Sequence, residues 1–140
     1  MKSDRSGSVQ YAALPWRQGQ AGLEILLLTS RETRRWVIPK GWPMIGVTPQ
    51  DCAAEEAFEE GGVRGRVSGS IGAFAYDKIL KDGSARALNV DVFPLHVTEE
   101  LKSWPEADER TRQWFTLIEA ADAVDEPDLA TLIRVFTAPA

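Results

Sequence analysis

The pattern of apolar residues along the chain predicts a sheet. Residues 23–29 form an almost continuous aliphatic run of the kind found in buried strands, and the polar turn at 81–84 predicts a hairpin between two long strands. Pro94 predicts a bulge or an edge strand, because proline cannot donate to a ladder. The predicted strands are residues 9–16, 23–29, 36–38, 66–76, 87–97 and 112–117.

Two segments have the periodicity of helices. The first begins after Thr48, a suitable N-cap followed by Pro49 at the first helical position, and ends at Gly61 and Gly62. The second covers residues 127–136. Because strands precede and follow the first helix, we expect an α/β fold with a mixed β-sheet between helices. The apolar face of the second helix is formed by Leu129, Leu132, Ile133 and Phe136.

The first helix concentrates negative charge. Residues 41–63 hold five acidic side chains and no basic one. Glutamates one turn apart destabilise a helix by roughly 0.2–0.5 kcal/mol per pair, so a bound cation would be favourable, and carboxylates suit a hard ion such as Mg²⁺. The alternative is a solvated acidic face, although such faces usually interleave Lys or Arg. At about 100° per residue, one side holds Ala53, Ala54, Ala57 and Phe58, and the other holds Glu55, Glu56, Glu59 and Glu60.

Seven residues of this segment have the spacing of a known motif: Gly41, Glu56, Ala57, Glu59, Glu60, Gly62 and Val63. In this spacing the segment resembles the Nudix box, and the resemblance implies the Nudix α/β/α sandwich, as a single domain over residues 1–140. Two positions depart from the family pattern. Val47 stands where the family has Glu, and Glu55 stands where it has an Arg that helps to orient the metal-binding glutamates. Glu55 should therefore raise the demand for a metal or for a basic residue from elsewhere.

The resemblance extends beyond the box. Residues 36–41, 65–72 and 97–120 are similar to the branch of diphosphoinositol and diadenosine polyphosphate hydrolases. In that branch a basic pair before a Trp and a second aromatic residue contacts the polyphosphate. The resemblance therefore implies that Arg110 and Arg112 bind substrate. The alternative is a surface arginine pair beside a core Trp114.

Basic residues also precede the acidic helix. Residues 30–35 form a polar loop rich in arginine, and loops beside a rigid scaffold often carry binding groups. Lys40 directly adjoins the proposed metal site. We therefore interpret Arg31, Lys40 and Gly41 as substrate-binding, the alternative for the two basic residues being solvated surface charge.

The resemblance implies hydrolysis of a phosphoanhydride bond in a nucleoside or inositol polyphosphate, most typically a dinucleoside polyphosphate or a diphosphoinositol polyphosphate. Mg²⁺, or Mn²⁺, held by Glu56, Glu59 and Glu60 would neutralise phosphate charge and lower the pKa of an attacking water. Glu59 or Glu60 would take the proton of that water.

Two other functions stay open. Val47 and Glu55 are compatible with a catalytically weakened Nudix domain that acts as a nucleotide or phosphate sensor. The five tryptophans are compatible with a protein-interaction domain. Turnover in the presence of metal would separate the enzyme from both.

The composition and net charge limit the binding partners and the cellular compartment that we expect for the protein. A net charge of −5 and a pI near 4.9 argue against general nucleic-acid binding. No apolar run is long enough to span a membrane, residues 1–9 contain no apolar leader, and the single cysteine excludes an internal disulfide. We therefore expect a cytoplasmic monomer or homodimer that acts on a small molecule.

Overall fold

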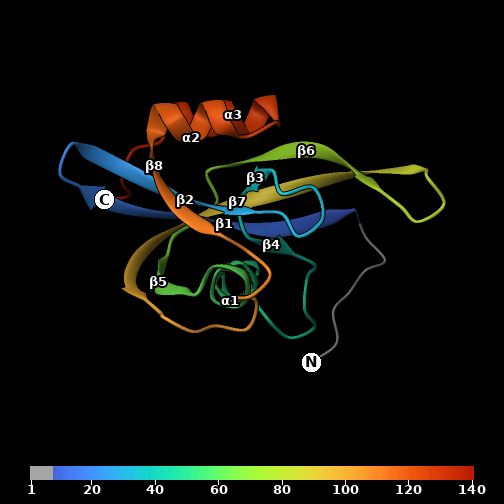
Figure 1. Cartoon of the computed structure of the whole chain (residues 1–140), viewed down its shortest axis with the longest axis horizontal. Coiled ribbons are helices and arrows are strands. Elements are labelled where there is room, and N and C mark those ends of the chain that lie inside the picture. The colour runs from blue at the N-terminus through green and yellow to red at the C-terminus, as the bar shows by residue number, and fades with distance from the viewer. Residues whose placement is uncertain (1–7) are drawn as a thin grey trace.

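The computed structural model describes residues 8–140 (Figure 1). The sequence predicts no apolar leader in residues 1–9, and residues 1–7 of that segment lie outside the described range. Within the described range, no helix is both long and apolar enough to cross a membrane. In chain order the elements are β1 (Val9–Gly19), β2 (Gly22–Thr29), β3 (Trp36–Val37), β4 (Lys40–Gly41), α1 (Pro49–Gly61), β5 (Val63–Val67), β6 (Gly72–Ile79), β7 (Ala85–Glu100), β8 (Arg112–Thr116), α2 (Leu117–Ala123) and α3 (Pro127–Arg134).

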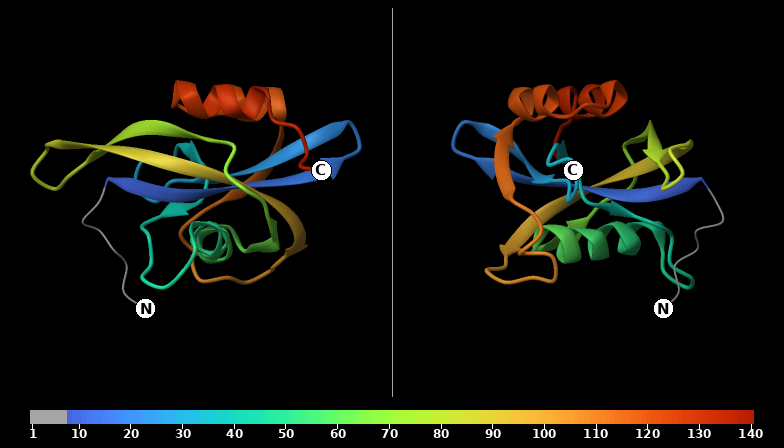
Figure 2. Two further views of the ribbon diagram at one scale, coloured as in Figure 1. Left: turned by 180° about the vertical axis from the view of Figure 1, so that it is seen from behind. Right: turned by 45° about the vertical axis from the view of Figure 1, so that its right-hand side comes forward.

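The strands form one mixed sheet around β1 and β7. These two strands are parallel from the pair Val9 and Asn89 to the pair Trp16 and His96. The remaining strand pairs are antiparallel, including the predicted hairpin of β6 and β7. α1 covers one face of the sheet, and α2 and α3 cover the other (Figures 1 and 2). The expected α/β/α sandwich is therefore confirmed.

The aliphatic run of β2 contributes to both faces. Leu27 is fully buried in a cluster with Ile133 of α3, whereas Leu26 is fully buried in a second cluster with Ala53 and Ala57 of α1. Since successive side chains of a strand point to opposite faces, a strand covered on both sides must be apolar throughout. The small alanines let α1 pack closely on the sheet.

α1 begins and ends where the sequence predicts. The Thr48 side chain accepts a hydrogen bond of 3.1 Å from the backbone N–H of Asp51, and Pro49 opens the helix. Gly62 ends it in the left-handed conformation, with φ of 65°. A glycine adopts this conformation without the steric cost that a side chain would add.

One expectation about the faces of α1 is wrong. Glu60 was expected opposite the alanines, but it is buried on the same side as Ala53 and Ala57. Seven residues make almost two full turns, so position 60 returns to the direction of position 53. Glu60 is therefore a partly desolvated carboxylate, held between helix and sheet.

Two further expectations about the strands are wrong. The predicted strand 66–76 is two strands, β5 and β6, which pair end to end with β7. Pro94 marks the change of partner: its carbonyl accepts a hydrogen bond of 2.8 Å from Ser68 in the intervening segment. Because β7 lies inside the sheet, Pro94 is not on an edge strand, and the irregular register of β7 lies at Thr98, opposite Arg64 and Gly65, rather than at Pro94.

α2 was not predicted. The strand expected over 112–117 ends at Thr116, which caps α2 through a reciprocal pair of hydrogen bonds with Glu119. This capping box is readable in the sequence as Thr-x-x-Glu. The second helix expected from Pro127 is present as α3.

Candidate active site

A large cleft brings most of the predicted site residues together. It has a volume of about 1230 Å³ and is bordered by α1, β4, the β6–β7 hairpin and the loop 101–111. Arg112 is not among the lining residues. The predicted residues that line it are Arg31, Lys40, Gly41, Glu56, Glu59, Glu60 and Arg110.

Glu56 and Glu60 form a hydrogen-bonded carboxyl pair in this cleft. Burial raises the pKa of Glu56 to about 9, and the negative charge and hydrogen bond of Glu60 add to the effect. Glu60 is only 9% exposed, and burial raises its pKa as well. Two carboxylates this close cannot both ionise easily, so without a bound cation Glu56 holds its proton at neutral pH. A cation that displaced this proton would be held by both groups.

β4 fixes the position of both carboxyl groups. Gly41 lies against Glu56 so closely that a methyl group at position 41 would overlap with the Glu56 carboxylate. The backbone N–H of Lys40 donates a hydrogen bond of 3.4 Å to Oε1 of Glu60. β4 is itself paired with β1, so the central sheet positions the pair.

Two cations lie near Glu60. Nη2 of Arg110 is 3.8 Å from Oε2 of Glu60, and the Arg110 side chain is only 9% exposed. The positive charges of Arg110 and Lys40 oppose the effect of burial on the Glu60 pKa. Arg110 also donates to Oε1 of Glu106 at 2.8 Å and to the carbonyl oxygen of Thr29 at 3.2 Å.

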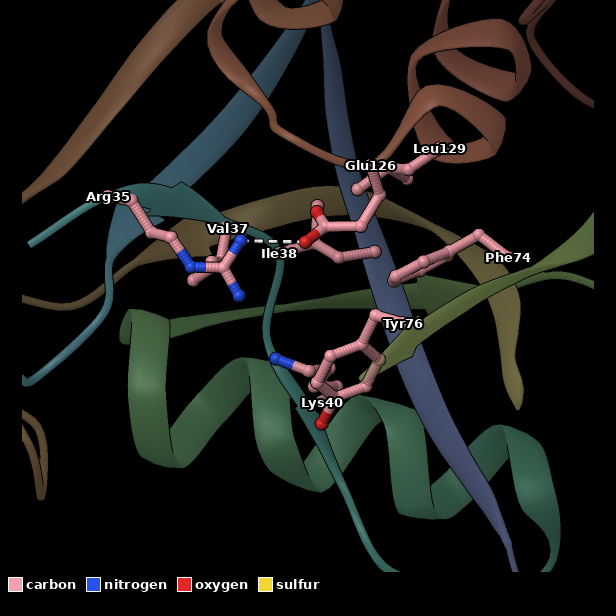
Figure 3. A pocket seen from close by; sticks show the side chains of 8 residues that line it. All are labelled: Arg35, Val37, Ile38, Lys40, Phe74, Tyr76, Glu126 and Leu129. Carbon is pink, nitrogen blue, oxygen red and sulfur yellow. Dashed lines mark hydrogen bonds and ion pairs between the residues drawn. The ribbon is translucent and has the colours of Figure 1, made fainter. Parts of the chain in front are cut away.

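Lys40 is one of the residues that line a small side cavity (Figure 3). Its Nζ is 5.0 Å from the centre of the Tyr76 ring, and burial lowers the pKa of the Lys40 ammonium group. The side cavity measures about 10 Å³, roughly the space of one water molecule. Across it, Arg35 and Glu126 form an ion pair of 2.7 Å. The charge of Arg35 is therefore balanced by Glu126.

Glu59 has Glu55 as a close neighbour. Burial raises its pKa, and the neighbouring Glu55 raises it further through its charge and through a hydrogen bond. Glu59 therefore interacts with Glu55, which stands at the position where the family motif has Arg. The structure brings Glu56 and Glu60 together, while Glu59 lines the cleft beside them.

The loop 101–111 satisfies carbonyl groups at the end of α1. Nε1 of Trp104 donates a hydrogen bond of 3.1 Å to the backbone carbonyl oxygen of Glu60. The backbone N–H of Glu106 donates one of 3.1 Å to the backbone carbonyl oxygen of Glu59. The last carbonyls of a helix have no partner within the helix. The loop therefore anchors the turn that carries two of the predicted ligands.

The two arginines predicted as a substrate-binding pair, Arg110 and Arg112, lie in different environments. Arg110 lines the cleft, but Arg112 donates to the carbonyl oxygens of Gly61 and Gly62 at 3.0 Å each. Arg112 also donates to the carbonyl of Leu101 at 2.6 Å, and its guanidinium carbon lies 4.0 Å from the centre of the Trp104 ring. The structure thus places Arg112 at the C-terminus of α1, where a cation interacts favourably with the helix dipole.

Some lining residues were missed from the sequence. Lys78 and Lys81 belong to the β6–β7 hairpin. Their positive charge beside a predicted turn could have indicated that they bind substrate phosphates. Trp42 follows Gly41 directly and lines the cleft as well. Glu106 and Tyr76 had no local signal, because only the folding of distant segments brings them to the cleft.

The donor set fits a hard divalent cation. In the part of the chain that the structure describes, no three His, Cys, Asp or Glu side chains converge closely enough to form a complete metal site. Mg²⁺, however, often uses only one or two carboxylates together with water and substrate phosphates. Glu56 and Glu60 supply such a pair, and Glu59 would complete it by turning away from Glu55.

Comparisons with known proteins agree with this geometry. Residues 10–136 match the NUDIX domain model. Nudix hydrolase 16, mitochondrial, of Arabidopsis thaliana is 32% identical over 111 residues, which are 75% of this chain and 60% of that protein. Diphosphoinositol polyphosphate phosphohydrolase 2 of Rattus norvegicus is 32% identical over 124 residues, 84% of this chain and 63% of that protein.

The fold matches as well. The crystal structure of C. elegans Ap4A hydrolase superimposes with a TM-score of 0.63 at 18% identity, covering 91% of this chain and 93% of that chain. The chain spans about three fifths of the length of the two curated relatives. With almost its whole length matched by the family model, this chain belongs to the NUDIX domain family.

Proposed function

We propose that the cleft hydrolyses a phosphoanhydride bond of a nucleoside or inositol polyphosphate in a metal-dependent reaction. Dinucleoside polyphosphates and diphosphoinositol polyphosphates are the preferred classes. The observation that carries the proposal is that Glu56 and Glu60 lie together in a cleft that is also lined by basic side chains. The names of the rat and C. elegans relatives support these two substrate classes.

The size of the cleft supports an extended substrate. Its volume of about 1230 Å³ exceeds the roughly 300–1,000 Å³ typical of pockets for small ligands. Lys78, Lys81 and Arg86 line it on the hairpin, and Arg31 lines it in the loop before β3. A chain of phosphates would therefore meet cations along much of its length.

Glu56 and Glu60, joined by Glu59, would hold Mg²⁺ or Mn²⁺. When bound, the ion would supply neutralisation of phosphate charge and acidification of a water molecule. A carboxylate oxygen of Glu59 or Glu60 accepts the proton of the attacking water. The protein's remaining task is to orient the substrate relative to these groups.

Lys40 and Arg31 bind phosphate oxygens in this proposal. The Lys40 side chain borders the cleft beside Glu60, whereas the Arg31 side chain is 56% exposed and lies 3.8 Å from Glu109. Such an exposed ion pair contributes little to stability, so Arg31 can exchange Glu109 for a phosphate at low cost. Gly41 contributes by leaving room for the Glu56 carboxylate.

The test is product analysis after incubation with Mg²⁺ and dinucleoside polyphosphates, inositol pyrophosphates, nucleoside triphosphates and nucleotide sugars. Glu60→Gln should keep the fold and lower turnover at least about 100-fold, because it removes a metal ligand and a base. Glu99→Gln, an exposed change on β7, is the matched control. Near-normal turnover by Glu60→Gln, or no turnover of any compound by the natural protein, would contradict the proposal.

A sensor without turnover is the second candidate, and the contact between Glu55 and Glu59 favours it. Burial and the charge of Glu55 raise the pKa of Glu59 and so disfavour the ionised form that a metal ion requires. Ligand-induced thermal stabilisation without product would identify a sensor. A protein-interaction domain has less support, because each of the five tryptophans packs against another residue: Trp16 on His96, Trp36 on Phe115, Trp42 on Arg86, Trp104 on Arg112 and Trp114 on Arg17.

A further inference from the structure

The Arg110 side chain lines the cleft but is largely enclosed by protein. Only 9% of its side chain is exposed, against 56% for Arg31. Its guanidinium group reaches three segments at once: Glu60 at 3.8 Å on α1, Glu106 at 2.8 Å in the loop 101–111, and the Thr29 carbonyl at 3.2 Å at the end of β2. A side chain tied to three segments has little freedom to follow a substrate.

The negative groups around Arg110 need a cation. Glu56 and Glu60 share a hydrogen bond, and the charge of Glu106 acts on both of them. α1 offers no basic residue of its own, because residues 49–61 include none and position 55 is a glutamate. The cation at these carboxylates must therefore come from another element.

The nearby basic residues are less suited to this task. The Arg35 guanidinium forms an ion pair with Glu126, and the Arg112 guanidinium donates to the carbonyl groups of the last residue and the C-cap of α1. Lys40 reaches Glu60 through its backbone N–H, while its ammonium group lies over the Tyr76 ring. Among these residues, Arg110 is the one that forms an ion pair with Glu60.

We propose that Arg110 is a positioning residue that acts as the resident counter-cation of the carboxylate cluster, holding Glu60 and Glu106 in place before a metal ion binds. It thus supplies from outside α1 a positive charge that the helix lacks at position 55. This role differs from the substrate contact expected from the sequence. The part that concerns turnover rests on the proposed function, and the part that concerns the metal-free protein does not.

The first test uses no substrate. Thermal melting in chelator should show that Arg110→Met lowers the Tm by at least about 5 °C, because removing one partner of an enclosed ion pair leaves the other uncompensated. Arg31→Met, a change of the same chemistry at an exposed cleft residue, should shift the Tm by less than about 2 °C. Mg²⁺ should restore more of the Tm in Arg110→Met than it adds to the natural protein.

A double variant separates charge from packing. If Arg110 balances Glu60, the variant Glu60→Gln/Arg110→Met should melt higher in chelator than Arg110→Met alone, because the uncompensated anion is gone. Loss of packing alone would make the double variant no more stable than Arg110→Met. Should Arg110→Met fail to fold, rescue of folding by Glu60→Gln would support the proposal in the same way, and its absence would overturn it.

The second test separates positioning from substrate contact through kinetics. With the substrate that the natural protein hydrolyses fastest, Arg110→Met should lower kcat at least tenfold and change KM less than threefold, and Arg110→Lys should recover part of kcat. Arg31→Met should mainly raise KM. An Arg110→Met variant with unchanged kcat, raised KM and an unchanged Tm in chelator would overturn the proposal. If no substrate is hydrolysed, the melting results still decide it.

Discussion

The indole Nε1 of Trp104 donates a hydrogen bond of 3.1 Å to the backbone carbonyl oxygen of Glu60, 44 residues earlier in the chain. This bond joins the last turn of α1 to the loop 101–111. The same loop carries Glu106, whose N–H donates to the carbonyl of Glu59. The two glutamates at the end of the motif are thus held through their own backbone, so the site depends on the loop as well as on the helix.

Gly41→Ala should damage the site more than the fold. The added methyl group would overlap with the Glu56 carboxylate and displace it from Glu60. Because misplacement by about 1 Å can cost roughly 100-fold in rate, we expect kcat to fall by about that factor, while stability should change little because the end of the Glu56 side chain can move aside.

The matched control for this change is Gly69→Ala. A methyl group at position 69 would meet no atom within 4 Å. Steady-state kinetics and thermal melting of both variants give the comparison. Equal kcat values for the two variants would show that the close approach of β4 to Glu56 has no role in catalysis.

Glu55→Arg should stabilise the metal-free protein. The change removes the anion that raises the Glu59 pKa and places a cation one turn away from Glu59. Replacing a like-charge pair by an opposite-charge pair at this spacing should add about 0.4–1 kcal/mol to the free energy of unfolding. Thermal melting in chelator measures it, and Glu55→Gln separates loss of the anion from gain of the cation. A lower Tm for Glu55→Arg would mean that Glu55 is stabilised by another cation.

The stability of the metal-free protein should decrease as the pH rises. The pKa of Glu56 is about 9 in the folded protein, against an ordinary value of 4.5. A raised pKa means that the folded state binds the proton more tightly, so the contribution is fully present below pH 4.5 and is lost as the pH rises through 9. In chelator, the Tm at pH 8.5 should therefore be lower than at pH 6.

Two variations test the origin of this pH dependence. Glu56→Gln should flatten the slope of Tm against pH, because the amide does not titrate. Saturating Mg²⁺ should also flatten it, since the cation stabilises the ionised carboxylates. If the natural protein and Glu56→Gln have the same slope in chelator, another group is responsible.

The local part of the site could be predicted because it is encoded within a short segment. Gly41 and Glu56 belong to one loop and helix, so their spacing alone indicated that they act together, and Thr48 and Gly62 fixed the ends of that helix. The alternation of Leu26 and Leu27 between two cores likewise follows from an unbroken apolar run. Such features depend on neighbours in the chain.

The remaining part depends on contacts between distant segments. Charge alone shows that Arg110 and Arg112 can bind anions, but it does not show that Arg110 meets Glu60 or that Arg112 meets the carbonyls of Gly61 and Gly62. The break between β5 and β6 is equally nonlocal, because it occurs where β7 changes its partner. These relationships follow from the topology of the sheet.

Arg112→Met should act through the helix rather than through the substrate. The change removes three hydrogen bonds to the carbonyls of Gly61, Gly62 and Leu101, together with the contact on Trp104. Because a charged donor stabilises its acceptors by about 1.5–3 kcal/mol, we expect a loss of about 2–3 kcal/mol in the free energy of unfolding. Chemical denaturation measures this loss. Activity should fall by a similar factor for substrates with two phosphates and with four, since no phosphate contact is removed.

The control is Arg31→Met, which should weaken binding of the longer substrate with little change in stability. If Arg112→Met keeps its stability but selectively raises KM for the tetraphosphate substrate, Arg112 binds substrate instead of stabilising the helix end.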